Sequence, residues 1–349
     1  MTVPIESPQP IAQNVALLSE ASSYPEHPRT VEVVETHMSW VFLTDLHVYK
    51  LKKPVRYDYL DFSTLAARRH FCEEEVRLNR RLAASVYLDV VPLARTESGV
   101  IQVGGQGTVV EWLVKMRRLP AERMLDRALT DGTAGAAEAH AVAVRLGAFH
   151  LSLPGAPVTA QAYRQRLHQA IAENEQALCD RAFALPVDEV RALCEAQRAV
   201  LNRHSTLFDE RVAAGRVVEG HGDLRPEHVC LAPPISIIDC LEFSEQLRTL
   251  DAADEAGFLA LECERLGRAD FARAFLSAYA EATGDTPPAA LMRFYQSHRA
   301  VVRAKIAVWH LQEAAYRGSP KWNALARRYL QLAGEHIASS ASGLKGTST

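Results

Sequence analysis

The most informative part of this sequence is Glu219-Gly-His-Gly-Asp-Leu-Arg-Pro-Glu-His-Val-Cys-Leu231, which continues after Ala232-Pro-Pro234 as Ile235-Ser-Ile-Ile-Asp-Cys-Leu-Glu-Phe243. Two short β-type runs, 229–231 and 235–238, could pair as a small hairpin. That pairing would bring the loop with Asp223 and the acid Asp239 to the same end of it. Converging carboxylates repel each other unless a cation or a proton lies between them. Two carboxylates together with phosphate oxygens suit Mg²⁺, which keeps several waters and rarely takes a cage made of protein alone.

Two other interpretations of these residues are open at this point. Asp is common in turns because its side chain bonds nearby backbone groups, so Asp223 could cap a turn and Asp239 could end a strand. His221, Asp223, His228 and Asp239 could also bind zinc or iron, as in a metal-dependent hydrolase. The Leu-Arg-Pro-Glu spacer between Asp223 and His228 matches no ligand spacing typical of such a site.

Composition is that of an ordinary globular protein. Of 349 residues, 48% are hydrophobic and 23% charged, and the length predicts two lobes or domains. A net charge of −3 gives no electrostatic reason to expect nucleic acid or a membrane as a partner. The six cysteines include no CxxC pair, and neither a secretory signal nor an apolar run of about 18 residues is visible. We therefore expect reduced thiols and a cytoplasmic protein.

The chain divides into four segments. Residues 1–29, rich in Pro and Ser, predict a partly ordered lead-in, and residues 30–118 predict a lobe with a β-sheet and one helix. Residues 119–338 predict a mostly helical lobe that contains the β-type runs quoted above, and residues 339–349 predict a disordered tail.

Within the first lobe the pattern predicts the order β-β-β-α-β-β. The second and third strands flank Asp45-Leu46, which suggests a hairpin, although the usual Asn-Gly or Asp-Gly turn is absent. A helix is expected from Leu65 to Ala84, with Ser63 or Thr64 as its cap.

The His221-Gly-Asp-Leu segment followed by Ile238-Asp239 resembles the catalytic loop and metal-binding aspartate of aminoglycoside and choline kinase-like phosphotransferases. The family pattern is HGDLxxxN, followed by a hydrophobic-Ile-Asp segment. The resemblance implies an α+β, two-lobed, protein-kinase-like fold with ATP and Mg²⁺ as cofactors. It is closest to a bacterial branch that is sometimes fused to a P-loop ATP-binding domain. We expect that domain to be absent here, because no GxxxxGK[ST] motif appears.

By this resemblance Asp223 would accept or orient the substrate hydroxyl, and Asp239 would hold Mg²⁺ on the nucleotide phosphates. Arg225 could stabilise charge that develops on the phosphoryl oxygens. The chain departs from the pattern at His228, where the family has Asn as a second metal ligand. Mg²⁺ prefers oxygen ligands, so either Glu227 or Glu242 could complete the metal shell instead of His228.

The N-terminal half fits the same resemblance. Strand alternation puts Val48, Lys50 and Lys52 on one face, so either lysine could reach the nucleotide phosphates. We prefer Lys50, because Val48 would then lie under adenine. Glu75 begins the Glu-x-x-Leu-x-x-x-Leu spacing of the family and would pair with that lysine. Met116 opens a segment that resembles the hinge between the lobes, where adenine would bind.

Two more segments are family-like. In Leu250–Leu259, either Asp251 or Asp254 would be a structural acid that braces the catalytic loop. A late helix carries basic residues that could close over an anionic or nucleotide-bound site, although a solvated helix face is the simpler interpretation. The residues that mark this helix are Tyr295, Arg299, Arg303 and Lys305.

The expected function is therefore an ATP- and Mg²⁺-dependent transfer of a phosphoryl group to a hydroxyl of a small molecule. Glu262, Glu264 and Glu281 could meet a polycationic antibiotic, but a sugar, an amino alcohol or another metabolite is equally open. The alternatives are a catalytically degenerate nucleotide-binding or regulatory protein, motivated by His228, and the metal-dependent hydrolase.

Overall fold

The computed structural model describes residues 11–57, 60–312, 317 and 319–342. Its contacts divide the chain into two compact units. The first unit comprises Met1–Arg123 and His228–Gln246, and the second comprises Met124–Glu227 and Leu247–Thr349. The hairpin segment with Asp239 therefore groups with the N-terminal residues, whereas Asp223 lies in the second unit.

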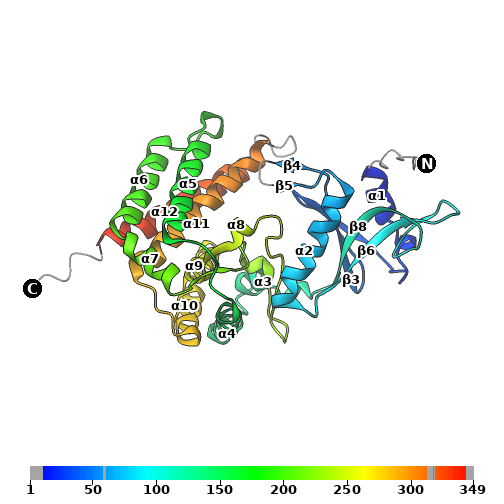
Figure 1. The fold of residues 1–349 in the computed structure, drawn as a ribbon, viewed down its shortest axis with the longest axis horizontal. Helices are drawn as coiled ribbons and strands as arrows, with labels where there is room; N and C mark the ends of the chain where they lie inside the picture. The colour runs from blue at the N-terminus through cyan, green and yellow to red at the C-terminus, as the bar shows by residue number, and fades with distance from the viewer. Residues whose placement is uncertain (1–10, 58–59, 313–316, 318, 343–349) are drawn as a thin grey trace, which may run out of the picture. The chain divides into compact units, whose positions relative to one another are not determined.

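An antiparallel six-stranded sheet forms the frame of the first unit (Figure 1). The strand order is β1-β2-β3-β8-β6-β7, and β2 pairs with β3 across the predicted Asp45-Leu46 turn. Three strands of the sheet precede the helix Leu65–Ala83, as predicted, but three follow it, whereas the predicted order β-β-β-α-β-β had two. The strands are β1 (Glu32–Glu35), β2 (Ser39–Leu43), β3 (His47–Lys52), β6 (Tyr87–Arg95), β7 (Ile101–Val103) and β8 (Thr108–Arg117).

Each face of this sheet has its own apolar cluster. Helix α1 (Ile11–Leu18) contributes Leu18 to a buried cluster with Tyr49 and Leu51 of β3. Helix α2 (Leu65–Ala83), capped by the Thr64 hydroxyl, contributes to a second cluster that contains Val114 of β8. Because side chains alternate along a strand, Tyr49 and Leu51 on the α1 side leave the lysines of β3 to the α2 side.

Two short hairpins complete the first unit. Strands β10 (Val229–Cys230) and β11 (Ser236–Ile237) pair antiparallel, with Val229 opposite Ile237, as the sequence predicted. Strands β4 (Arg56–Tyr57) and β5 (Leu60–Asp61) form the other hairpin. Helix α1 falls in the segment predicted to be a lead-in, whose first ten residues lie outside the described part of the chain.

The second unit is mostly helical. Helices α5, α6, α7, α9, α11 and α12 contribute to its largest apolar cluster, and its only regular sheet among the described residues is the antiparallel pair β9 and β12. Its elements are α3 (Leu125–Thr130), α4 (Ala136–Ser152), α5 (Ala160–Leu178), α6 (Val187–Arg203), α7 (Ser205–Ala213), β9 (Val217–Glu219), β12 (Thr249–Asp251), α9 (Ala252–Arg265), α10 (Ala269–Thr283), α11 (Ala289–Trp309) and α12 (Pro320–Ser342).

The short helix α8 (Glu245–Arg248) spans the division between the units. Helix α12 runs through Ser342, so it includes residues 339–342 of the segment predicted to be a tail. The remaining residues of that segment, 343–349, lie outside the described part.

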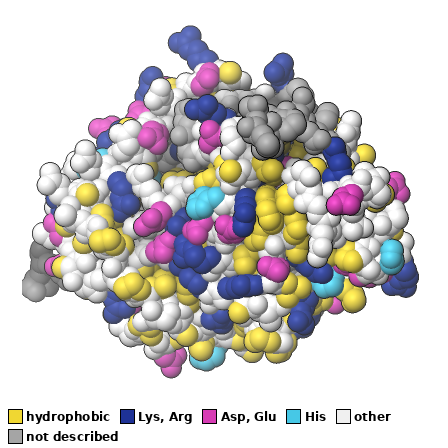
Figure 2. All heavy atoms as spheres, turned by 45° about the vertical axis from the view of Figure 1, so that its right-hand side comes forward, with side chains coloured by type: hydrophobic (Ala, Val, Ile, Leu, Met, Phe, Trp, Pro, Cys, Tyr) yellow, Lys and Arg dark blue, Asp and Glu magenta, His cyan; other side chains and the backbone are white. Residues whose placement is uncertain are grey.

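Charges of both signs are mixed on the surface. On the face that Figure 2 shows, Lys and Arg side chains are interspersed with Asp and Glu, in keeping with the net charge of −3. None of the helices in the described ranges is long and apolar enough to cross a membrane.

Candidate functional site

The first unit brings Lys50, Glu75 and Asp239 together. The Lys50 Nζ atom donates to Glu75 Oε1 at 2.9 Å and to Asp239 Oδ1 at 2.7 Å. Burial lowers the pKa of Lys50, but the charges of Asp239 and Glu75 raise it well above its usual value. Lys50 therefore stays protonated, with one carboxylate on each side.

Lys52, two residues along β3, holds the other oxygen of the same glutamate. Its Nζ atom donates to Glu75 Oε2 at 2.6 Å and also to Glu242 Oε1. Glu75 is 0% exposed and Lys52 is 1% exposed. Burial raises the pKa of Glu75, but the charges of Lys50 and Lys52 lower it below its usual value. The two lysines and three acids thus form one chain of alternating charges, and both lysines named by the sequence are part of it.

Asp239 has an unusual backbone conformation. Its φ is +62°, in the left-handed region, which costs a residue with a Cβ atom roughly 1–2 kcal/mol. The flanking amides are held from α2 and β6: the Asp239 N–H donates to the Tyr87 hydroxyl at 3.0 Å, and the Cys240 N–H donates to Asn79 Oδ1 at 2.8 Å. Strained backbone that is fixed in this way is typical of functional sites.

His228 faces the same carboxylate from the other side. Its Nε2 atom lies 3.4 Å from Asp239 Oδ2, whereas Lys50 contacts Oδ1. The hairpin fixes both residues, because the N–H of Ile238 donates to the His228 carbonyl at 2.9 Å. The Asp239 side chain is 42% exposed, so an ion could reach it.

A nucleotide-bound Mg²⁺ needs only one or two protein carboxylates, because phosphates and waters complete its shell. Asp239 supplies one such carboxylate, and His228 beside it adds an imidazole nitrogen. A metal held by protein side chains alone would need more donors. Throughout the described ranges, no group of three or more His, Cys, Asp or Glu side chains is arranged to hold a metal ion. The donor set therefore fits a nucleotide-bound ion better than the predicted hydrolase site.

In the second unit, Glu255 of α9 holds the loop that contains Asp223. Its carboxylate accepts the N–H of His221 at 2.9 Å and that of Gly222 at 2.7 Å, and it is 2.8 Å from His150 Nε2. Burial raises the pKa of Glu255, but these hydrogen bonds and the nearby imidazoles lower it to about 2. Gly222 has a φ of +89°, a conformation that favours glycine.

This finding corrects the sequence prediction, which named Asp251 or Asp254 as the acid that braces the loop. Asp251 instead accepts from Arg211 and from the Tyr295 hydroxyl. Asp254 pairs with Arg299, and so bears on the loop only through it. The sequence prediction missed Glu255, because three acids within five residues of one helix start gave no reason to choose the third.

Asp223 and Arg225 of the same loop contact each other, with Arg225 Nε 3.1 Å from Asp223 Oδ2. Burial lowers the pKa of Arg225, but the charge of Asp223 raises it above its usual value. The loop thus pairs its acid with a cation two residues later.

The basic residues of α11 are neither a simple solvated face nor a row of unpaired charges. Arg299 donates to both Asp254 oxygens and, at 3.4 Å, to the Gly222 carbonyl. Arg303 lies 3.3 Å from Glu262. Lys305 lies over the ring of Trp309. Arg299 thus links Asp254 to the Gly222 carbonyl of the loop that contains Asp223.

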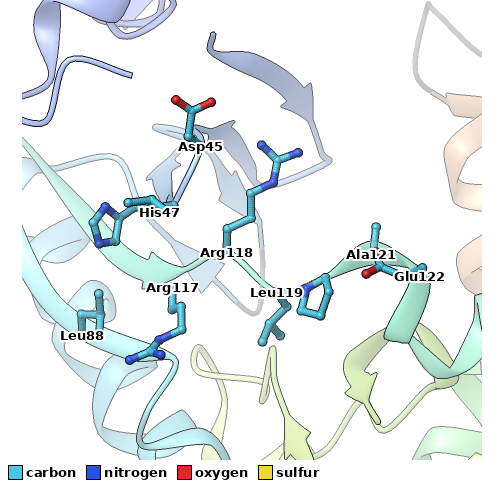
Figure 3. A pocket seen from close by; sticks show the side chains of 10 residues that line it. Asp45, His47, Leu88, Arg117, Arg118, Leu119, Ala121 and Glu122 are labelled. Atoms are coloured by element: carbon cyan, nitrogen blue, oxygen red, sulfur yellow. The ribbon is translucent and has the colours of Figure 1, made fainter. Parts of the chain in front are cut away.

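Met116 is placed in β8 opposite Val48 of β3, and it packs against the apolar cluster that α2 shares with the sheet. A pocket of about 660 Å³ opens where β8 ends, next to the predicted hinge (Figure 3). Neither Met116 nor Lys50 lines this pocket, so we do not assign it to the nucleotide. Its lining residues are Asp45, Leu46, His47, Leu88, Arg117, Arg118, Leu119, Pro120, Ala121 and Glu122.

Comparison with known proteins gives relatives in two mycobacteria. No protein-family model matches the chain. Curated proteins of Mycobacterium tuberculosis and Mycobacterium bovis, each called an uncharacterized protein, are 34% identical to it over 321 residues. The match covers 89% of this chain but 61% of each relative, so the chain spans less than two thirds of their length. Their names carry no activity over to it.

Solved structures of small-molecule kinases share the fold. A choline/ethanolamine kinase family protein from Mesorhizobium loti aligns with a TM-score of 0.55 and 16% identity, covering 94% of this chain and 98% of that one. The choline kinase of Cryptosporidium parvum aligns with a TM-score of 0.52 and 10% identity, covering 96% and 99%. Identities this low show the fold alone, and that fold is the one the sequence resemblance predicted. The chain has the α+β, kinase-like fold of the choline and ethanolamine kinase structures.

Proposed function

We propose that this chain is a phosphotransferase that moves the γ-phosphoryl group of ATP to a hydroxyl of a small molecule, with a divalent metal ion as cofactor. The arrangement of Lys50, Glu75 and Asp239 carries the proposal. A fully buried carboxylate holds a protonated lysine beside a second, partly exposed carboxylate. The kinase-like fold supports it, since the structures that share this fold are named as choline and ethanolamine kinases.

In this proposal the first unit binds the nucleotide phosphates. Lys50 exchanges its contact with Asp239 for a phosphate oxygen while Glu75 keeps it in position. Asp239 and His228 hold the metal ion, which neutralises charge on the phosphates when it is bound. Phosphoryl transfer asks a protein mainly for positioning and charge neutralisation, and these residues supply both.

The loop of the second unit supplies the group that acts on the acceptor. Asp223 takes the proton of the acceptor hydroxyl while the oxygen of that hydroxyl forms a bond to the γ-phosphorus. The bond from that phosphorus to the β–γ bridging oxygen breaks, and ADP leaves. Arg225, which contacts Asp223, stabilises the negative charge that develops on the phosphoryl oxygens. In other enzymes such proton transfer raises the reaction rate about 10²–10⁴-fold.

The acids considered for a polycationic substrate favour a different acceptor. Glu262 is buried and accepts from Arg265 and the Tyr329 hydroxyl. Glu264 lies 2.7 Å from His336. Glu281, the third of these acids, is exposed on α10. Since the carboxylates of Glu262 and Glu264 already have partners, we propose a small hydroxyl compound, such as a sugar or an amino alcohol, rather than a polycationic antibiotic.

The first test is isothermal titration calorimetry of ATP with and without a divalent metal, on wild type and on Asp239→Ala. We expect metal-dependent binding that the substitution abolishes. A positive result justifies a screen of hydroxyl-bearing metabolites for ADP release. If ATP binds to neither protein with any metal, the proposed function is wrong.

A catalytically degenerate nucleotide-binding protein is the second candidate, and the contact between His228 and Asp239 is what favours it. His228→Asn discriminates between the two. A degenerate site should gain metal-dependent transfer from the change, whereas a site adapted to histidine should lose activity or keep it unchanged.

A further inference from the structure

We propose that the ion held by Asp239 and His228 is a divalent first-row transition-metal ion, such as Mn²⁺, rather than Mg²⁺. The inference rests on the proposed function, because it concerns the same nucleotide site, and it adds the identity of the metal. Its basis is the pairing of an imidazole nitrogen with a carboxylate oxygen at one end of the hairpin of β10 and β11.

The hairpin presets the two donors. His228 directly precedes β10 and Asp239 follows β11 after one residue, and the N–H of Ile238 bonds the His228 carbonyl at 2.9 Å. Asp239 is further fixed by the Tyr87 hydroxyl on its amide. The donors are therefore held by backbone structure rather than by flexible loops, which keeps the ordering cost of metal binding low.

The distance between the donors suits one shared ion. His228 Nε2 and Asp239 Oδ2 are 3.4 Å apart. Two donors bound at about 2.0–2.2 Å to the same ion lie roughly 3–3.5 Å apart when they occupy neighbouring positions. The other Asp239 oxygen faces Lys50, so the lysine and the ion do not compete for the same atom.

The chemistry of the pair then selects the metal. Mg²⁺ is a hard cation that binds oxygen and keeps its waters, and it gains little from an imidazole. Mn²⁺ accepts carboxylate, phosphate and water oxygens as Mg²⁺ does, and affinity for mixed nitrogen and oxygen sites rises from Mn²⁺ along the first-row divalent series. A site with one imidazole and one carboxylate, completed by phosphate oxygens, therefore favours a first-row transition-metal ion over Mg²⁺, and Mn²⁺ is the member of that series most like Mg²⁺ in its oxygen ligands.

The test compares metals on three proteins: wild type, His228→Asn, and the control His140→Asn, which changes an exposed histidine of α4. Calorimetry gives the dissociation constant of a non-hydrolysable ATP analogue with Mn²⁺ and with Mg²⁺ for each. Replacement of second-shell residues at metal sites costs about 10–100-fold in affinity, so loss of a direct ligand should matter at least as much. We expect the preference for Mn²⁺ over Mg²⁺ to fall at least about tenfold in His228→Asn and to stay unchanged in His140→Asn.

A spectroscopic readout is independent of affinity and of activity. Pulsed electron paramagnetic resonance of the Mn²⁺–nucleotide complex should show nitrogen modulation from a bound imidazole in wild type and in His140→Asn, but not in His228→Asn. Absence of that signal in wild type overturns the inference even if His228→Asn does not fold.

The outcomes separate the inference from the function on which it rests. Equal Mn²⁺ preference in wild type and His228→Asn overturns the metal assignment alone and leaves the nucleotide site intact. Failure of the nucleotide to bind with either metal overturns both.

Discussion

Lys50 and Lys52 are equivalent in the strand pattern but not in their surroundings. Lys52 lies between Glu75 and Glu242, so its removal would take from the largely buried Glu242 its lysine partner and leave Glu75 with Lys50 alone. Lys50 shares Glu75, but its second partner is the partly exposed Asp239. A lysine beside an exposed carboxylate can exchange it for a phosphate at lower cost, because water can reach the group left behind. We therefore assign phosphate binding to Lys50 and a structural role to Lys52.

The two substitutions to methionine should then have opposite profiles. Loss of one partner of a buried ion pair costs about 3–5 kcal/mol, so Lys52→Met should lower the free energy of unfolding by about that amount. Lys50→Met should lower it less, because the second partner of Lys50, Asp239, is partly exposed to water whereas that of Lys52, Glu242, is largely buried. It should weaken nucleotide binding about 10–100-fold, the range of one charge-assisted hydrogen bond. Urea unfolding and calorimetry measure the two effects. A Lys52→Met protein that folds normally and binds nucleotide poorly would reverse the assignment.

Sequence was a good guide to some of these residues and a poor guide to others. Glu75 was named because Leu78 and Leu82 follow it at the family's Glu-x-x-Leu-x-x-x-Leu spacing, and the structure buries all three. The contact of Glu242 with Lys52 joins residues 190 positions apart, and no local pattern reports such a distance. For the same reason the sequence left open which lysine faces Asp239.

Among the elements, α9 has a role that its sequence concealed. Its Glu255 accepts the amides of His221 and Gly222, and so fixes the conformation of the loop that ends in Asp223. A carboxylate that accepts several hydrogen bonds is stabilised in its ionised form. The stability of this loop should therefore depend on pH.

The sign of that dependence follows from the pKa. The pKa of Glu255 is about 2 in the folded protein, below the value of about 4.3 for an exposed glutamate. Its contribution is fully present above pH 4.3 and is lost as the pH falls toward 2. Each pKa unit corresponds to about 1.4 kcal/mol, so Glu255→Gln should destabilise the protein by about 3 kcal/mol at pH 7. Urea unfolding from pH 7 to pH 3 should show that the difference in free energy of unfolding between wild type and Glu255→Gln narrows below pH 4.3.

Glu281→Gln on the exposed side of α10 is the matched control. Its free energy of unfolding should differ little from that of wild type, and the difference should not narrow below pH 4.3. If the difference in free energy of unfolding between wild type and Glu255→Gln stays constant down to pH 3, the carboxylate charge does not brace the loop.

The elements themselves followed from local chemistry. Strand alternation around Lys50 and a hydroxyl cap of α2 are short-range features; the alternation was predicted, and Thr64 is the cap of the two that the sequence offered. Helix α1 was not predicted, because its eight residues are a short apolar run after a segment rich in proline. Its burial against Tyr49 comes from tertiary packing, which a single sequence does not report.

For the whole molecule, the division of contacts assigns different chemistry to each unit. The segment 228–246 groups with the N-terminal residues because its partners are Lys50, Lys52, Asn79 and Tyr87, far away in the sequence. The first unit thus carries the phosphate-binding lysine and the metal-binding aspartate of the proposal. Asp223 and its loop belong to the second unit.

This division predicts that nucleotide binding and transfer can be separated by single substitutions. Asp223→Asn removes the group that takes the acceptor proton but leaves the charge chain of the first unit intact. It should therefore bind ATP with a dissociation constant within about twofold of wild type. The rate of acceptor-dependent ADP release should fall about 10²–10⁴-fold. Asp239→Ala should lose both. Calorimetry and an ADP-release assay on the same preparations measure the two properties. If Asp223→Asn bound nucleotide as poorly as Asp239→Ala, the loop would be part of the nucleotide site, and the proton-transfer role of Asp223 would have to be abandoned.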